Sequence, residues 1–559
     1  MLEPEYFYGK SDKLIEMYQD LEDWILQDIA NRLLKSGDLS GTSDRELWKL
    51  EQMGLHRQEI IKRLSQLTGK SRNEIRRLLQ DSAMTSFSND SEVLEKVAQV
   101  VPLLQNNDVI QALNAELTKT MGELGNLTRT TMMQSQRDLL NMLNEVDFRV
   151  ASGLQSYSSA ICEVLDRYAE SGVMVNYPTG SSRSLEAAVR CCIVTSMNQT
   201  AAEVTNQYII QHGVEYVVVS QHLGARYNPK DPTGVSSHDW WQGKAYKIHG
   251  SEPGFPNLLE STGYDIDFDA KRGVCVNMLG LHGYNCRHSH GPWYKELGES
   301  LPEIDREESQ KRYDLEQKQR AFERAVRKTK RQLLVKEQEL NTFPDDENIR
   351  GDYDKLAYRL RMQNQKYGEF CAENNLQKQY DRVKVAGFKK PQAAKANGRA
   401  TVYKNEQYEA YEANIGKNMV SKSVFVRIMS DRSEKKLFTH YSEAVKRGDV
   451  SPLADYDLYR RTAIELQDKC VGLVTSNGVK LEKRSLHSID RVIGSVEQRR
   501  SGITVDDVVK ALTSPEAEVR PVRYSKTAAS QKFIYRNAEV TINPITKTLI
   551  QVNPHHREK

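Results

Sequence analysis

Apolar residues recur at three- and four-residue steps through much of the first two hundred residues, which is the spacing of one face of an α-helix. Leu14, Ile15 and Tyr18 begin such a stripe in residues 12–34. Ser71-Arg72-Asn73-Glu74 fits a capping box that would start a further helix. The same spacing predicts helices over residues 46–67, 91–118, 136–151 and 184–212. We therefore expect residues 1–212 to form a helical domain in which packing stabilises a bundle.

Short strands and turns replace this pattern after residue 212. Residues 214–220 are rich in β-branched and aromatic side chains, which favour a half-buried strand. Proline and glycine mark turns at residues 228–234 and 252–256. The sequence therefore predicts a small mixed α/β module over residues 213–295.

Two long charged segments, each with one thin apolar stripe, come next. They occupy residues 302–340 and 347–379, and Pro344, which cannot continue a helix, lies between them. This pattern predicts a helical hairpin over residues 300–385. Its basic residues 317–331 are typical of a solvated helix face, with phosphate contact as the alternative. The small, polar and basic residues 386–400 are typical of a linker.

The rest of the chain changes character again. Residues 401–475 are charged and Tyr-rich, and we expect a helical connecting region to which no task is assigned. Amphipathic helices are then predicted over residues 486–494 and 504–512, followed by strands over 519–524, 531–535, 538–543 and 548–552. Helices followed by an antiparallel sheet predict an α+β domain over residues 480–559. The predicted fold is multidomain, with a mainly α N-terminal part, a small mixed α/β module, a long helical hairpin and a C-terminal α+β domain.

Composition adds limits on the class of protein. The 559 residues are 38% hydrophobic, which is enough for several cores, and 79 basic against 76 acidic residues leave a net charge of +3. Residues 480–559 differ, because fifteen Lys and Arg against nine Asp and Glu give them a net charge of +6. No run of eighteen apolar residues exists, so we expect no membrane span. The seven scattered cysteines indicate reduced thiols in a cytosolic setting.

Histidine, cysteine and tryptophan crowd into one stretch of the mixed module. Its potential metal ligands are Cys275, His282, Cys286, His288 and His290, preceded by His238 and His249. A structural zinc site needs four thiolate or imidazole ligands, and this stretch has no C-x-x-C pair. We therefore expect turns and a side-chain hydrogen-bond network, rather than zinc, to hold the module, and we expect no cofactor. If zinc is present, Cys286 with His282, His288 and His290 would bind it; a catalytic role for the cluster is a further alternative.

Two motifs of this stretch carry a family resemblance. They are SSHDWWQGKAY at residues 236–246 and GYNCRHSHGPW at residues 283–293. They resemble the phage minor capsid protein family, type two, which is related to head-morphogenesis proteins of the phage Mu F class. QRAFERAVRKTKRQL at residues 319–333 and DRVKVAGFKKPQAAKANGR at residues 381–399 extend the resemblance, which runs from about residue 10 to residue 400. The loop at residues 265–278 is longer than the family pattern, and this puts Cys275 in doubt as a ligand.

The last eighty residues present a different chemistry. The helix over residues 486–494 places His487 and Arg491 on one face, and His487 is the only histidine between His440 and His555. HSIDRVIGSVEQRRSGITVDDVVKAL and KFIYRNAEVTINPITKTLIQVNP resemble the barnase–EndoU–colicin–RelE-like ribonuclease domains of phage toxins. That resemblance implies metal-independent RNA cleavage. In that reaction His487 would be acid or base, Arg491 the phosphate clamp, and Thr541 and Asn543 the residues that orient the scissile phosphate. The alternative is that His487 and Arg491 only pair with neighbours, in a domain that is inactive or binds a partner or DNA.

Two compatible hypotheses for the function follow. The first is a structural, low-copy component of a tailed-phage or prophage head, attached near the portal vertex, with the portal protein, the inner capsid and packaged DNA as partners. The second is an enzyme at the C-terminus that acts on RNA after delivery from the particle. Both place the protein in the virion, and in the host cytoplasm before assembly and after injection. A cytoplasmic helical scaffold unrelated to phage is a third, weaker hypothesis.

Overall fold

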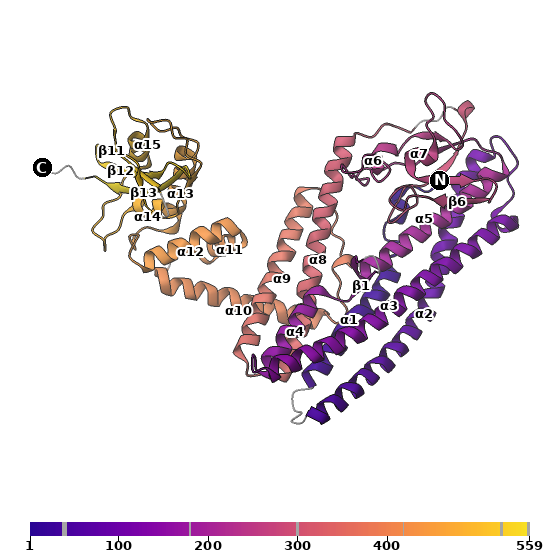
Figure 1. Ribbon diagram of the computed structural model, residues 1–559, viewed down its shortest axis with the longest axis horizontal. Coiled ribbons are helices and arrows are strands. Elements are labelled where there is room, and N and C mark those ends of the chain that lie inside the picture. The colour runs from indigo at the N-terminus through magenta and orange to yellow at the C-terminus, as the bar shows by residue number, and fades with distance from the viewer. Residues whose placement is uncertain (36–41, 178–179, 298–300, 418, 526–528, 556–559) are drawn as a thin grey trace. The chain divides into compact units, whose positions relative to one another are not determined.

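The computed structural model describes residues 1–35, 42–177, 180–297, 301–417, 419–525 and 529–555. The chain divides into two compact units, Met1–Ala400 and Thr401–Lys559 (Figure 1). Across the described residues, no helix combines the length and the apolar character that crossing a membrane requires.

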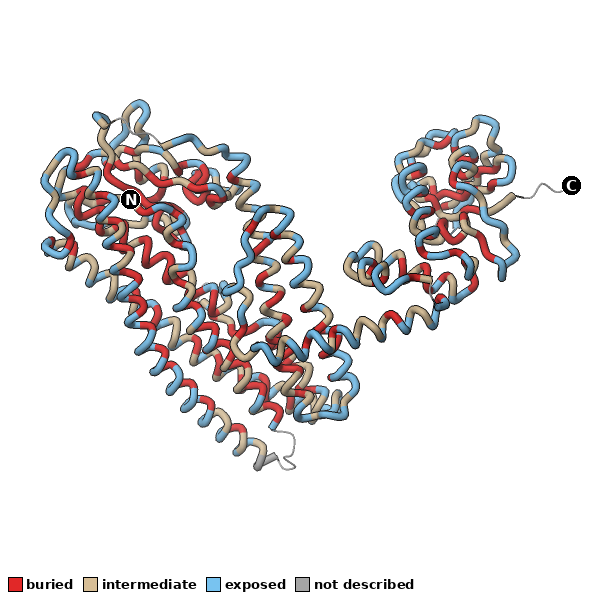
Figure 2. The backbone as a smooth tube through the Cα atoms, turned by 180° about the vertical axis from the view of Figure 1, so that it is seen from behind, coloured by how far each residue is buried: buried red, intermediate tan, exposed pale blue. Residues whose placement is uncertain are grey.

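The first unit begins with a bundle of long helices. The helices are α1 (Asp12–Lys35), α2 (Thr42–Leu94), α3 (Asn107–Ala151), α4 (Tyr157–Ser171) and α5 (Leu185–Gln211), with the short turns η1 (Pro4–Phe7) and η3 (Leu103–Gln105). Strands β1 (Met174–Asn176) and β2 (Ser182–Ser184) form a small hairpin before α5. Helix α5 lies inside the bundle, since residues on all of its sides are buried (Figure 2). The apolar stripes of the other helices pack around it, as amphipathic helices do.

Two sequence predictions in this bundle are wrong. Helix α2 does not restart at Ser71, because Leu64, Leu67 and Ile75 continue one buried stripe through that point. The Ser71 hydroxyl instead donates to the carbonyl of Thr68 within the helix. The single helix predicted over residues 91–118 is interrupted between Leu94 and Asn107, where Pro102 lies and where Asn106 caps the start of α3.

The mixed module follows α5 and packs on it. Its elements are β3 (Tyr216–Val219), α6 (His238–Trp241), β4 (Ala245–Lys247), α7 (Leu258–Thr262), β5 (Tyr264–Asp267), β6 (Arg272–Cys275), β7 (His290–Trp293) and η4 (Lys295–Leu297). Strands β4, β3 and β7 form an antiparallel sheet, and β5 pairs with β6. Such short strands leave much of the module in turns, so its shape depends on side-chain contacts.

The predicted hairpin is formed by α8 (Arg306–Thr342) and α9 (Glu347–Glu373), followed by η5 (Asp381–Val383). The linker predicted over residues 386–400 is wrong in its larger part, because α10 (Lys390–Ile415) begins there. Ala396 and Ala400 of α10 are buried among residues of α8 and α9, and Arg399 forms an ion pair with Asp354 of α9. Alanine favours helix, and its small side chain permits this close packing.

The second unit has one core that helices and strands share. Its helices are α11 (Lys422–Ser430), α12 (Arg432–Lys446), α13 (Tyr456–Cys470), α14 (His487–Ile493) and α15 (Val505–Thr513). Its strands are β8 (Lys483–Arg484), β9 (Glu518–Val519), β10 (Arg523–Tyr524), β11 (Ala529–Tyr535), β12 (Ala538–Asn543) and β13 (Thr548–Pro554). The sheet order is β10-β11-β12-β13-β8, β9 also pairs with β11, and β8 runs parallel to its neighbour β13. Pro521 lies in the gap between β9 and β10, where a single strand was expected.

The boundary predicted between residues 475 and 480 is absent from this unit. Tyr441 and Tyr459, from α12 and α13, belong to the same buried cluster as Val540 and Leu549 of the sheet. One face of the sheet needs an apolar cover, and the region predicted to be a connector provides part of it. The predicted fold class as a whole is confirmed: the chain is mostly helical and multidomain, with small sheets and a C-terminal region that contains strands.

Candidate functional site

Three buried metal-binding side chains meet in the mixed module. The Cys286 sulfur lies 3.9 Å from Nδ1 of His238 and 3.8 Å from Nδ1 of His288. All three ligand atoms lie within 4.8 Å of one another, and all three residues are buried. The single turn α6 supplies His238, and the tight turns before β7 supply Cys286 and His288.

The outer nitrogens of both imidazoles are held by acceptors. His238 Nε2 donates to the carbonyl of Leu279 at 2.8 Å, and His288 Nε2 donates to Oε1 of Gln242 at 3.0 Å. Oε1 of Gln242 also accepts the backbone N–H of His222, which fixes the amide orientation. Because Nε2 carries the proton in both rings, both Nδ1 atoms present lone pairs toward the thiol.

A second group in the module separates the other two predicted ligands from Cys286. His282 Nδ1 lies 3.0 Å from Oδ1 of Asn198, and its Nε2 lies 2.7 Å from Nδ1 of His290. His290 Nε2 lies 3.0 Å from Oδ1 of Asn206. Burial lowers the pKa of His290 to about 3 and that of His282 well below its ordinary value, so both rings are neutral. Two neutral rings supply two N–H donors for these three contacts, so the group is a closed polar chain inside the protein in which two of the contacts are hydrogen bonds.

The remaining predicted ligands lie outside both groups. The Cys275 thiol contacts the carbonyls of Asn277 and Leu281. The His249 ring packs edge-on against Phe268. The predicted set of Cys286, His282, His288 and His290 is therefore divided in two, and His238 joins Cys286 and His288.

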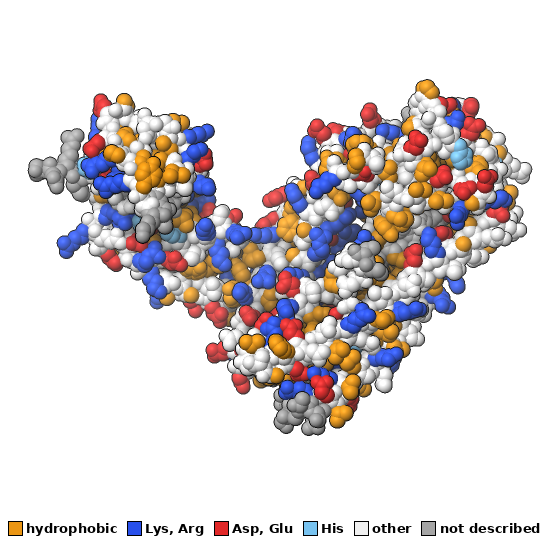
Figure 3. Space-filling model, in the orientation of Figure 1, with side chains coloured by type: hydrophobic (Ala, Val, Ile, Leu, Met, Phe, Trp, Pro, Cys, Tyr) orange, Lys and Arg blue, Asp and Glu red, His pale blue; other side chains and the backbone are white. Residues whose placement is uncertain are grey.

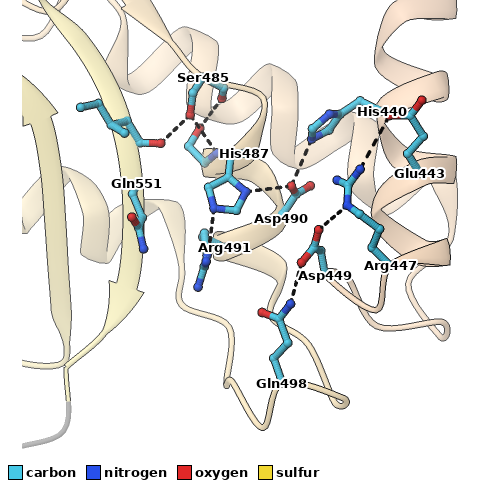
Figure 4. A network of polar contacts seen from close by, with 12 residues as sticks. His440, Glu443, Arg447, Asp449, Ser485, His487, Asp490, Arg491, Gln498 and Gln551 are labelled. Carbon is cyan, nitrogen blue, oxygen red and sulfur yellow. Dashed lines mark hydrogen bonds and ion pairs between the residues drawn. The ribbon is translucent and has the colours of Figure 1, made fainter. Parts of the chain in front are cut away.

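A buried carboxylate organises the polar network of the second unit (Figure 4). Asp490 of α14 is fully buried, and its carboxylate accepts a hydrogen bond from the hydroxyl of Tyr459 at 2.7 Å. Tyr459 donates to Oδ1, whereas His440 Nε2 lies 3.1 Å and His487 Nδ1 3.3 Å from Oδ2 of Asp490. A buried carboxylate requires such donors, because charge without partners is costly in the interior.

The His487 ring reaches from this buried carboxylate to the surface. Its side chain is 41% exposed. Arg491 Nε lies 3.0 Å from His487 Nε2, and because a guanidinium can only donate, Nε2 is the acceptor. The proton of the neutral ring is then on Nδ1 and is donated to Asp490. This arrangement orients an imidazole and keeps the lone pair of Nε2 at the protein surface.

The start of α14 is tied to strand β13, and this positions His487 next to the sheet. The Ser485 hydroxyl donates to the carbonyl of Ile550 at 2.5 Å and accepts the backbone N–H of Ser488 at 3.1 Å. Gln551 of β13 is drawn on the sheet side of His487 in Figure 4, and its Nε2 donates to Oδ1 of Asn553 at 3.1 Å.

Thr541 and Asn543, predicted to orient a phosphate, have other surroundings. Oδ1 of Asn543 accepts the backbone N–H groups of Ile545 and Thr546, both at 2.9 Å, and so shapes the turn between β12 and β13. Thr541 is buried and pairs across the strands with Gln551. The contacts of the described residues do not join either side chain to His487 or Arg491.

Sequence reasoning found His487 and Arg491 and missed Asp490, His440 and Tyr459. The spacing of His487 and Asp490, three residues apart on one helix, was the available signal for the carboxylate. His440 and Tyr459 come from α12 and α13, which are distant in sequence. Their approach depends on the shared core and could not be read from local patterns.

Comparisons with known proteins match the chain to one family and to one curated relative. The family described as "Phage minor capsid protein 2" matches residues 2–371. A protein of Lactococcus phage LL-H described as "Structural protein" is 25% identical over 354 residues, which are 60% of this chain and 88% of that protein. No solved structure matches the chain.

Proposed function

Because this chain belongs to the phage minor capsid protein 2 family, we propose that it is built into the phage head at the portal vertex, with its first unit as the attachment. The matched residues 2–371 lie entirely within the first unit, Met1–Ala400, and leave the second unit outside the match. This division supports an anchor followed by a second functional part. The portal protein and the inner capsid wall are the partners of the anchor in this proposal.

Quantitative mass spectrometry of purified particles tests the location. The proposal predicts a copy number close to that of the portal protein and far below that of the major shell protein. Cross-links between the first unit and the portal would support the vertex position. Absence from particles, or a copy number equal to that of the shell protein, would contradict it.

We propose that the second unit is a metal-independent ribonuclease carried by the particle. One observation carries this proposal: His487 is oriented by buried Asp490 through Nδ1, while Nε2 is at the surface next to Arg491. An imidazole with a fixed orientation can transfer a proton, and a guanidinium next to it can bind the phosphate of the same substrate. The net charge of +6 over residues 480–559 suits a polyanionic substrate.

The chemistry follows from these positions. An RNA phosphate draws the Arg491 guanidinium away from His487, which frees the lone pair of Nε2. Nε2 takes the proton of the 2′-hydroxyl, the 2′-oxygen bonds to phosphorus, and the bond from phosphorus to the 5′-oxygen breaks. The leaving oxygen takes a proton from the imidazolium or from water. Asp490 stabilises the imidazolium formed in between. Gln551 replaces Thr541 and Asn543 in our proposal as the amide that orients the phosphate.

A binding role without cleavage is the second candidate, and one contact favours it. Arg491 already occupies Nε2 of His487, and His440 shares the same carboxylate, so each side chain has a partner within the protein. In such a domain the positive charge would attract DNA or an acidic partner without chemistry.

Incubation of the purified full-length protein with RNA distinguishes the two candidates. A ribonuclease of this kind cleaves RNA in the presence of EDTA, leaves a 2′,3′-cyclic phosphate, and does not cut DNA of the same sequence, because DNA lacks the 2′-hydroxyl. Intact RNA after incubation, with DNA and RNA bound equally, would support the binding role and refute the enzyme.

A further inference from the structure

A cavity of about 350 Å³ in the first unit is lined by an unusual number of arginines. Figure 3 shows Lys and Arg side chains gathered in a hollow on this unit. The arginines are Arg190, Arg226, Arg287, Arg320, Arg324, Arg327 and Arg382. They come from α5, from two loops of the mixed module, from α8 and from η5. Arg320, Arg324 and Arg327 belong to the basic stretch 317–331, for which phosphate contact was the alternative, and the folding of the whole unit brings the other four arginines to them.

Carboxylates balance only part of this charge. Glu186 and Glu323 are the acidic residues among the described lining side chains. Glu186 forms ion pairs with Arg190 and Arg327, and Glu323 lies 3.7 Å from Arg382. Asp12, 3.4 Å from Arg190, and Glu316, 3.6 Å from Arg320, lie just outside the lining, so seven guanidinium groups against four carboxylates leave an excess of three positive charges.

Two further arginines are held by neutral groups. Arg226 donates to the carbonyls of Leu279 and Tyr284, and Arg287 donates to the hydroxyl of Tyr8 at 2.6 Å. These hydrogen bonds fix the guanidinium groups in place but do not neutralise them. The cavity therefore has positioned positive charges.

Arg320 is only weakly compensated by a carboxylate. Its closest carboxylate contact, with Glu316, is 3.6 Å long. Burial, followed by repulsion from Arg287 and Arg382, lowers the pKa of Arg320 to about 10. Positive charges that are partly removed from water and crowd one another destabilise the empty cavity, and an anion between them would relieve this repulsion.

We propose that this cavity binds phosphate groups, either of a free polyphosphate or nucleotide or of a nucleic-acid end. Guanidinium forks match the oxygen geometry of phosphate, and a phosphate neutralises more than one of them at once. The volume suits a ligand with the size of a nucleotide. This site is separate from the proposed ribonuclease site, since all of its residues belong to the first unit.

Calorimetric titration of the full-length protein with pyrophosphate tests the proposal. Arg320→Gln should weaken pyrophosphate binding about tenfold or more, because it removes a charged hydrogen-bond donor. Arg359→Gln is the matched control: it removes the same charge from an exposed position on α9 that does not line the cavity, and binding should change less than about twofold. No binding by the unaltered protein, or equal losses in both variants, would overturn the proposal.

A second measurement covers a folding defect and a third separates the ligand sources. Without ligand, Arg320→Gln should unfold at the same or a higher temperature than the unaltered protein, since it relieves repulsion. Strong destabilisation would mean that the charge is already compensated, and it would overturn the proposal.

A 5′-phosphorylated oligonucleotide that binds more tightly than its unphosphorylated match assigns the site to nucleic-acid ends. Equal, weak binding of both oligonucleotides alongside tight pyrophosphate binding assigns it to a free ligand.

A different observation carries a second inference: we infer that His238, Cys286 and His288 bind a zinc ion, at the point where the two histidines line the same cavity. Zinc–sulfur bonds of about 2.3 Å and zinc–nitrogen bonds of about 2.0 Å at tetrahedral angles separate sulfur and nitrogen by roughly 3.6 Å. The observed separations of 3.9 and 3.8 Å are close to this value. Both histidines also donate their outer N–H to an oxygen, as zinc-binding histidines commonly do.

The fourth position of this site would be taken by water, since no fourth His, Cys, Asp or Glu among the described residues has a ligand atom within 4.8 Å of all three. The neighbouring His222 ring stacks on His288 with centroids 4.7 Å apart, and its Nδ1 donates to the carbonyl of Leu223. The inference reverses the expectation of a metal-free module. That expectation rested on the absence of a C-x-x-C pair, whereas His238 approaches the thiol from 48 residues before Cys286.

Elemental analysis of the full-length protein, purified from zinc-supplemented cells, tests the site. About one zinc per chain is expected, and Cys286→Ser and His238→Gln should each remove most of it. Cys275→Ser is the control, since that thiol lies outside the cluster, and it should retain the metal. Metal-free protein that takes up no added zinc, or equal loss in the control, would refute the inference.

Discussion

Each unit of this protein contains a network of histidines, and the two networks differ in how they end. In the first unit, His282 and His290 form a chain closed at both ends by Asn198 and Asn206, and every member is buried. In the second unit the network is buried at Asp490 and ends at the 41% exposed His487. A closed chain can only hold its surroundings together, whereas an open one presents an oriented atom to a ligand. Histidine therefore holds the structure together where the last ring nitrogen of the network is buried, and it can meet a ligand where that nitrogen is exposed.

The largest expected effect is on folding, when the second unit is shortened at its N-terminal side. A fragment of residues 401–559 should fold alone and unfold cooperatively, because its core cluster is complete within those residues. A fragment of residues 480–559 should fail to fold, since it lacks α12 and α13, which cover the sheet and supply His440 and Tyr459. Circular dichroism and thermal melts of both fragments check this. A cooperative transition in the shorter fragment would show that residues 480–559 form a separate domain, as the sequence predicted.

The next effect concerns catalysis by the open network. His487→Ala in the full-length protein should reduce RNA cleavage on the order of 10²–10⁴-fold, which is the usual contribution of a positioned acid or base. His440→Ala removes a histidine that contacts the same carboxylate but is less exposed, and it should retain far more activity. Rates measured on one defined RNA provide the comparison. Equal rates for His487→Ala and the unaltered protein would leave only the binding role.

The closed network should respond in stability instead. His282→Ala leaves Oδ1 of Asn198 and Nδ1 of His290 buried without their partner, and each unsatisfied group costs about 1–3 kcal/mol. Calorimetric unfolding should show the transition of the first unit at lower temperature and that of the second unit unchanged. The transition of the second unit is thus an internal control. An unchanged first transition would show that the network is dispensable and would weaken the contrast between the two units.

The sequence predicted what depends on local pattern. Helices α1, α5, α8 and α9, the strands β11 to β13, and the pairing of His487 with Arg491 all follow from periodicity or from spacing on one helix. The rest depends on tertiary packing. The stripe that continues α2 past Ser71 overrides a capping signal, and the alanines of α10 become helical against α9 in a segment with the composition of a linker.

The site residues divide along the same line. Asp490 was within reach of a spacing argument, since it lies three residues after His487 on α14. His238 lies 48 residues from the thiol that it approaches, and the cavity arginines come from five segments. No periodicity relates such positions, so only the folded chain shows them together.

The smallest effect separates a turn residue from a site residue. Asn543→Ala removes the acceptor for the backbone N–H groups of Ile545 and Thr546 and should lower the stability of the second unit by about 0.5–1.5 kcal/mol. RNA cleavage should be unchanged at a temperature where the variant is folded, because Asn543 does not contact His487 among the described residues. Gln551→Leu is the comparison: our proposal assigns the orientation of the phosphate to this amide, so the substitution should slow cleavage with little change in stability. If Asn543→Ala instead abolishes cleavage while its melting temperature is unchanged, the phosphate-orienting role first expected for Asn543 is correct, and the assignment to Gln551 fails.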